Sequence, residues 1–80
     1  MKLTIISYEA KDDYHVCKDE SGVYHKLDLF SDSSFPEGEK MFNEDIRDDR
    51  LRVGKLLIGK TIEVDRTFPY IYFASNIKLI

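Results

Sequence analysis

The stretch that decides the fold runs from residue 14 to residue 30 and reads YHVCKDESGVYHKLDLF. Its second half, 23–30, alternates apolar and polar side chains with a period of two, which is typical of an antiparallel strand with one buried face. Residues 14–19 predict a partner strand, and residues 20–22 between them predict a tight turn. The side chains expected to point inward are Val23, His25, Leu27 and Leu29, and those expected to point outward are Tyr24, Lys26 and Asp28.

Two registers are open for this hairpin. A two-residue turn pairs Val16 with Leu27, whereas a three-residue turn with a glycine bulge places Cys17 opposite His25. The second register buries Cys17 together with His15 and exposes Val16. The hydrophobic pattern therefore favours the first register, because a one-residue slip exchanges the faces of a strand.

Outside the hairpin, the chain alternates strand signals with one helix signal. Residues 2–10 predict a strand whose apolar side chains fall on both faces, which indicates burial on both sides or a bulge. Residues 31–40 predict a loop punctuated by proline and glycine. A short helix should follow, capped by Asn43 and ended before Gly54. Residues 60–66 and 70–80 predict two further strands.

This order of elements resembles the OB-fold, a small five-stranded Greek-key barrel. The resemblance covers all 80 residues and rests on the order alone, because OB domains share no diagnostic motif. It implies one mainly β domain over residues 1–80, an antiparallel OB-like barrel with a short helix between its third and fourth strands. An SH3-like barrel is the alternative.

Length and charge exclude several classes of protein. Eighty residues with a net charge of −3 make one small domain, too small for a large multi-substrate enzyme. The acidic balance disfavours binding to duplex nucleic acid, which relies on clustered Lys and Arg. The single cysteine excludes an intramolecular disulfide, and without a signal peptide or a long apolar run we expect a cytoplasmic protein with no membrane partner.

Residues 54–61 read GKLLIGKT and satisfy the phosphate-binding pattern G-x-x-x-x-G-K-[ST]. A phosphate loop follows a buried strand and opens a helix. Here charged residues precede the match and the β-branched run TIEV follows it. We therefore interpret the match as entry into a strand and expect no nucleotide cofactor.

His15, Cys17 and His25 are residue types that bind zinc or form a Cys–His nucleophile. The favoured register turns His25 away from Cys17, and neither register supplies a fourth ligand or a group to orient the histidine. We expect no metal site and no catalytic residues among them.

Three pairs of acidic residues also suggest acid–base chemistry. Arginines interleave with most of them, so we interpret the pairs as a turn and the solvated side of a helix with ion pairs three and four residues apart. The pairs are Asp12-Asp13, Glu44-Asp45 and Asp48-Asp49.

The candidate binding surface is a set of aromatic side chains that alternation places outward. Its residues are Tyr24, Lys26, Tyr70 and Tyr72. In an OB barrel the third and fifth strands are neighbours, so these side chains would form one strip. Such a strip covers a sheet, binds a protein or a second copy of the chain, or stacks the bases of a single strand. The sequence favours a non-enzymatic module that engages a protein partner or itself, with single-stranded nucleic acid as the alternative.

Overall fold

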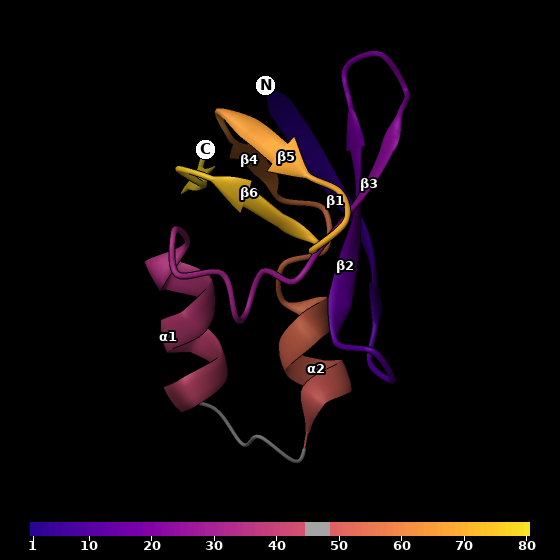
Figure 1. Cartoon of the computed structure of the whole chain (residues 1–80). Coiled ribbons are helices and arrows are strands. Elements are labelled where there is room, and N and C mark those ends of the chain that lie inside the picture. Colours follow the sequence, from indigo (N-terminus) through magenta and orange to yellow (C-terminus); the bar gives the residue numbers. More distant parts are fainter. Residues whose placement is uncertain (45–48) are drawn as a thin grey trace.

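The computed structural model describes residues 1–44 and 49–80. The fold is mainly β: the decisive hairpin forms one end of a five-stranded antiparallel sheet whose strand order is β3-β2-β1-β4-β7 (Figure 1). The strands of this sheet are β1 (Lys2–Glu9), β2 (Tyr14–Asp19), β3 (Tyr24–Leu27), β4 (Thr61–Glu63) and β7 (Lys78–Leu79). The predicted meander of three N-terminal strands is confirmed.

The sheet is not closed into a barrel, so the closed OB-like architecture is wrong. Strands β3 and β7 stand at opposite ends of the sheet order and do not pair with each other. The predicted final strand, 70–80, is divided into β6 (Phe73–Ser75) and β7, of which only β7 joins the large sheet. β6 pairs instead with β5 (Arg66–Phe68) in a separate two-stranded hairpin, and β5 lies where a turn was expected after the predicted strand 60–66. The chain between β6 and β7 bends at Asn76, whose φ of 53° lies in the left-handed region.

A bulge in β1 explains the apolar side chains on both of its faces. The register with β2 shifts between Ile5 and Ser7, so Ile6 is the extra residue. Because of this shift, Ile5 and Tyr8 are both buried although they are three residues apart, while Ile6 is exposed. The bulge, one of the two alternatives predicted for this strand, is confirmed.

The hairpin adopts the register that the hydrophobic pattern disfavours. Cys17 lies opposite His25 and Val16 opposite Lys26. His15 and Cys17 are buried, and Val16 is partly exposed. The predicted pairing of Val16 with Leu27 is therefore wrong.

The turn chemistry accounts for this register. The Asp19 amide donates to the Val23 carbonyl, and the Gly22 amide donates to the Asp19 carbonyl. Gly22 has a φ of 86°, so the loop of Glu20, Ser21 and Gly22 is a three-residue turn with a glycine bulge. A left-handed glycine at this point fixes which residues face each other along both strands.

Two helices, α1 (Pro36–Glu44) and α2 (Arg50–Lys55), replace the single predicted helix and lie below the sheet in Figure 1. The expected loop is present over 31–35, but residues 36–40 belong to α1, because proline is favoured in the first helical turn, where its missing N–H costs nothing. Asn43 lies inside α1 and so does not begin either of the two described helices. Asp49 caps α2 by accepting a hydrogen bond from the Arg52 amide at 3.3 Å. Of the acidic pairs, Asp45 and Asp48 lie outside the described residues.

The core lies between the sheet, the helices and the β5–β6 hairpin. Phe35, from the segment expected to be a loop, is among the largest fully buried side chains. Asp32 is buried nearby, and its Oδ2 accepts a hydrogen bond from the Ala74 amide at 2.9 Å. The other buried apolar residues are Leu3, Ile5, Tyr8, Cys17, Leu27, Leu29, Phe30, Val53, Leu57, Ile62, Val64, Ala74 and Ile77.

Candidate functional site

The outer face of β2 and β3 carries two lysines beside tyrosine rings. Lys18 lies opposite Tyr24, and its Nζ is 5.7 Å from the centroid of the Tyr24 ring. Tyr24 and Lys26 are both exposed, as alternation along β3 predicts. Each lysine is thus within range of an aromatic ring, which favours a defined side-chain position over a free one.

Tyr72 completes this face from a distant part of the sequence. Its ring meets the Tyr14 ring edge to face, with centroids 5.4 Å apart. Lys26 Nζ lies 5.3 Å from the Tyr14 centroid and 5.8 Å from the Tyr72 centroid. One ammonium therefore bridges two aromatic rings from separate segments. We call the set of Tyr14, Lys18, Tyr24, Lys26 and Tyr72 the tyrosine–lysine face.

The backbone of Tyr72 is in a conformation that tyrosine seldom adopts. Its φ is 58°, in the left-handed region, at the end of the turn between β5 and β6. The turn begins at Pro69, and the Ile71 amide donates to the Phe68 carbonyl at 3.1 Å. The Asp28 amide donates to the Tyr72 carbonyl at 2.7 Å and so fixes the turn against the end of β3.

Tyr70 does not join the face. It lies in the same turn, but its side chain is 98% exposed and lies outside the cleft described below. Of the four predicted surface residues, the structure brings Tyr24, Lys26 and Tyr72 together and leaves Tyr70 alone. The expectation that Tyr70 and Tyr72 lie on one strand is wrong, because both belong to the turn between β5 and β6.

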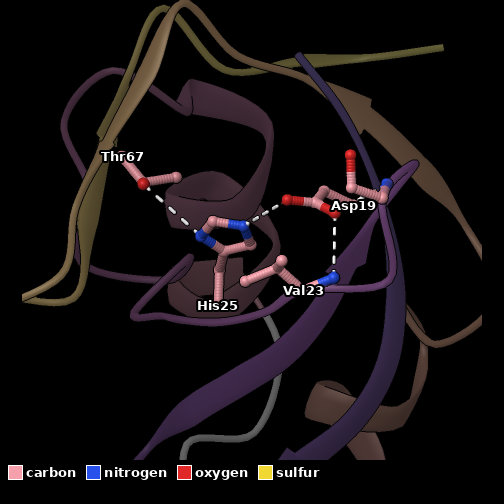
Figure 2. A network of polar contacts seen from close by, with 5 residues as sticks. Asp19, Val23, His25 and Thr67 are labelled. Atoms are coloured by element: carbon pink, nitrogen blue, oxygen red, sulfur yellow. Dashed lines mark hydrogen bonds and ion pairs between the residues drawn. The ribbon is translucent and has the colours of Figure 1, made fainter.

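A polar network crosses from β3 to the β5–β6 hairpin next to this face. Figure 2 shows the His25 ring between Asp19 and Thr67. His25 Nε2 lies 2.9 Å from Asp19 Oδ2, and Nδ1 lies 3.4 Å from Thr67 Oγ1. The other oxygen of Asp19 accepts hydrogen bonds from the Ser21 and Val23 amides, each at 2.9 Å. The His25 hydrogen bond, followed by those from the backbone, lowers the pKa of Asp19.

The order carboxylate, imidazole, hydroxyl in this network is that of a nucleophilic triad. The separation of 3.4 Å between Thr67 Oγ1 and His25 Nδ1 exceeds the roughly 2.6–3.2 Å at which a base activates a hydroxyl. Asp19 also serves the turn through two backbone amides. We therefore assign the network to holding β3 against the hairpin.

The network borders a cleft between β3 and the β5–β6 hairpin. The cleft has a volume of about 230 Å³. One wall consists of Tyr24, His25 and Lys26, and the other of Thr67, Pro69 and Tyr72. A larger hollow of about 330 Å³ near β4 and β7 has polar walls, and there Asn76 donates its side-chain amide to Asp65. Of these two hollows, the cleft between β3 and the β5–β6 hairpin is the one that combines aromatic rings with a cation.

His15 and Cys17 face the core, and burial determines the chemistry of both. Burial lowers the pKa of His15, whose Nε2 lies 2.8 Å from the Gly54 carbonyl, so the ring is neutral and donates there. Burial raises the pKa of the Cys17 thiol to about 12, which removes its thiolate at neutral pH. Within residues 1–44 and 49–80, no group of three or more His, Cys, Asp and Glu is arranged to hold a metal ion.

The phosphate-loop match occupies a helix-to-strand connection. Gly54 lies in α2, and Thr61 begins β4, so the chain leaves a helix and enters a strand. The Gly59 amide donates to the Ile5 carbonyl, and the Lys60 amide donates to the Leu57 carbonyl. The interpretation of the match as entry into a strand is confirmed, because a phosphate loop has the opposite order and free amides.

Sequence reasoning missed Tyr14, Thr67 and Pro69. Tyr14 belongs to the face only in the three-residue-turn register, and the glycine at position 22 was the signal for that register. Thr67 and Pro69 reach the cleft through a contact more than 40 residues away in sequence, which no local pattern reveals.

Comparison with protein-family models, with curated proteins and with solved structures finds no match to this chain. Over the described part of the chain, no helix has the length and apolar character needed to cross a membrane. The geometry of the tyrosine–lysine face and the cleft is therefore the basis for assigning a function.

Proposed function

We propose that this chain is a small non-enzymatic binding domain that engages a protein partner through the tyrosine–lysine face and the cleft beside it. The main observation in support of this function is that β2, β3 and the β5–β6 turn each contribute residues to one aromatic and cationic surface with a hollow at its edge. Tyrosine is enriched in the centres of protein interfaces because it combines a large apolar ring with a polar hydroxyl.

The conformation of Tyr72 supports a functional role for this surface. A non-glycine residue in the left-handed region costs about 1–3 kcal/mol and persists only where its surroundings hold it. Here the Asp28 amide and the contacts to Tyr14 and Lys26 hold it. The chain therefore tolerates a strained backbone in order to present this ring beside the cleft.

Charge favours a protein over a single-stranded nucleic acid as the partner. The chain carries a net charge of −3, and the two lysines of the face lie over its own tyrosine rings. Single-strand binding combines stacking with a continuous track of cations along the backbone. Two lysines are too few to form a continuous track of this kind.

The test uses Tyr24 of the face, with Tyr70 as a control outside it, because both side chains are exposed and their removal leaves the buried contacts intact. Tyr24 is 61% exposed and Tyr70 is 98% exposed. The variant Tyr24→Ser should lose the partner captured by the tagged wild-type chain and identified by mass spectrometry, whereas Tyr70→Ser should retain it. A titration of Tyr24→Ser with the purified partner should then show affinity lowered by about tenfold or more, the loss expected for removing an aromatic anchor.

A second control is Leu51→Ser/Leu56→Ser, which removes two apolar side chains at α2 that are each about half exposed. Its partner binding should equal that of the wild type. Equal binding by the wild type and by Tyr24→Ser would refute the assignment of the surface. Sedimentation of the free chain identifies a second copy as the partner, and quenching of tyrosine fluorescence by oligo-dT that disappears with added salt would favour nucleic acid instead.

A further inference from the structure

The wall of the cleft formed by β3 consists of three consecutive residues, Tyr24, His25 and Lys26. Successive side chains of a strand point to opposite faces of the sheet. Neighbours on both faces line the same hollow only if the hollow runs along the edge of the strand. The cleft therefore exposes the backbone edge of β3 as well as its side chains.

β3 is the end strand of the sheet, so one of its edges has no partner strand in the sheet. The hydrogen bond from the Asp19 amide to the Val23 carbonyl identifies that pair as a bonded pair of the antiparallel ladder. Bonded and non-bonded pairs alternate, so Cys17 with His25 is again bonded. The N–H and C=O groups of Tyr24 and Lys26 consequently point away from β2, toward the cleft.

After Tyr24 and Lys26, the next residue with outward backbone groups is Asp28, and its hydrogen bond shows what kind of partner this edge pairs with. The outward amide of Asp28 donates to the Tyr72 carbonyl at 2.7 Å, so the turn between β5 and β6 occupies one position along the edge. Among the described residues, no such bond is made by the outward backbone groups of Tyr24 and Lys26. The turn between β5 and β6 thus pairs with the edge of β3 at Asp28 and leaves the edge open at Tyr24 and Lys26.

We propose that the cleft binds an extended peptide segment of the protein partner, which adds to the sheet as a strand beside Tyr24 and Lys26. This inference rests on the proposed function and specifies the form in which the partner is recognised. An added strand lies about 4.8 Å from the edge strand and hydrogen-bonds its alternate backbone groups. The specificity of strand addition comes from side-chain positions along the edge.

The walls of the cleft select a lone strand over a second folded sheet. Thr67, Pro69 and Tyr72 form the wall opposite β3. A strand that belongs to another sheet would carry its own neighbour into this wall, whereas a single extended segment brings no second strand with it. The segment is therefore a peptide and not the edge of a second copy of this chain.

Charge gives the side-chain preference of this peptide. Lys26 carries the one fixed charge among the six residues that line the cleft, and Lys18 lies on the same face of the hairpin. Side chains of the added strand that project toward this face meet two ammonium groups and the ring of Tyr24. Peptides with acidic residues at alternate positions should bind best.

The test selects binders from a displayed library of random peptides of about ten residues, using the folded full-length chain as the target. Selected peptides should carry acidic residues two apart. N-methylation of every second amide in one phase should lower affinity by about tenfold or more, while methylation in the other phase should leave it within about twofold, since only alternate amides face β3. Equal effects in both phases would overturn strand addition.

Variants of the chain separate the edge from the face. Lys26→Pro removes the outward N–H and leaves the ladder with β2 intact, because proline is tolerated on the free side of an edge strand. Lys26→Ala keeps that N–H and removes only the ammonium. We expect Lys26→Pro to bind the selected peptides at least about fivefold more weakly than Lys26→Ala.

The two proposals fail in different ways. Equal binding by Lys26→Pro and Lys26→Ala, with binding still lost in Tyr24→Ser, would refute strand addition and retain the face as a binding surface. Unchanged binding in all three variants would refute the proposed function as well. A nitrogen-15 NMR spectrum of each variant verifies that it is folded, and protection of the Tyr24 and Lys26 amides from exchange on peptide binding is the direct signature of pairing.

Discussion

At the scale of single residues, burial sets the chemistry of His15. Its ring is buried beside Tyr8 and Phe30, and it donates to the Gly54 carbonyl. The ring resists protonation in the native state, because burial, the largest influence, lowers its pKa. In the unfolded chain the same ring titrates near pH 6.5.

This difference predicts that His15 destabilises the fold in acid. Between the native-state pKa and the unfolded pKa, the unfolded state binds the proton more fully than the native state does. The free energy of unfolding should therefore fall as the pH drops from about 7 through the unfolded pKa, with a slope from this group below the roughly 1.4 kcal/mol per pH unit that a whole proton would give. Urea unfolding of the wild type and of His15→Gln at several pH values measures the effect.

The comparison with His15→Gln isolates this group from Asp28. Burial raises the pKa of Asp28, so its contribution runs the other way: stability is greatest when Asp28 is protonated and falls as the pH rises. The wild type should lose more stability than His15→Gln between pH 7 and pH 5. Parallel curves for the two proteins would contradict the buried, neutral state of His15.

Gly54 is the second position where one residue limits the fold. A Cβ atom there would come within 3.0 Å of three carbons of the Tyr8 ring, and Tyr8 is itself buried against β2 and hydrogen-bonded to Asp13. Gly54→Ala should therefore lower the free energy of unfolding by about 1–3 kcal/mol, the cost of overpacking a core. Lys55→Ala, an exposed neighbour in the same helix, should change it by less than about 0.5 kcal/mol in the same urea titration.

At the scale of elements, the hairpin shows what sequence can predict. Alternation identified both strands and placed Tyr24 and Lys26 outward, because those inferences need only a period of two. The register needed more. Apolar pattern favoured burying Val16, but the structure buries His15, which finds its hydrogen-bond partner at Gly54, 39 residues along the chain. The apolar pattern alone did not reveal that long-range contact. The make-up of the face, including Tyr14 and Tyr72, depends on the register in which His15 is buried.

The turn that fixes this register makes a prediction at the same scale. Gly22 has a φ of 86°, and a Cβ there would meet only the Lys18 side chain at 3.9 Å, so backbone strain is the cost of substitution. Gly22→Ala should lower the free energy of unfolding by about 1 kcal/mol. Ser21→Ala, in the same turn but with its amide bond to Asp19 intact, is the control and should be nearly neutral. A neutral Gly22→Ala would contradict the left-handed turn.

At the scale of the whole molecule, polar contacts and the buried side chain of Ala74 join the β5–β6 hairpin to the rest. His25 Nδ1 lies 3.4 Å from Thr67 Oγ1, and the Asp28 amide donates to the Tyr72 carbonyl. Asp32 links the hairpin to the segment before α1 through its bond from the Ala74 amide. The opposite wall of the cleft belongs to this hairpin, so the cleft exists only while these contacts hold.

A variant of Asp32 therefore tests whether the hairpin and the sheet unfold as one unit. Its carboxylate accepts hydrogen bonds from the Ala74 amide and from the amide and hydroxyl of Ser34, and it is only 4% exposed. Asp32→Ala leaves the buried Ala74 amide without an acceptor and should lower the free energy of unfolding by about 2–4 kcal/mol, a large part of the total for a domain of this size. Exposed Ser33→Ala is the control and should be nearly neutral.

Urea unfolding followed by tyrosine fluorescence and by far-ultraviolet circular dichroism should give coincident transitions in the wild type, because Ala74 packs into the same core as Ile5 and Leu27. In Asp32→Ala, hydrogen exchange should accelerate equally at Asp65, whose amide is bonded to the Ser75 carbonyl, and at Ile5, whose amide is bonded to the Lys60 carbonyl. Faster exchange at Asp65 alone would show instead that the hairpin opens separately, and the cleft would then form and disappear without unfolding of the sheet.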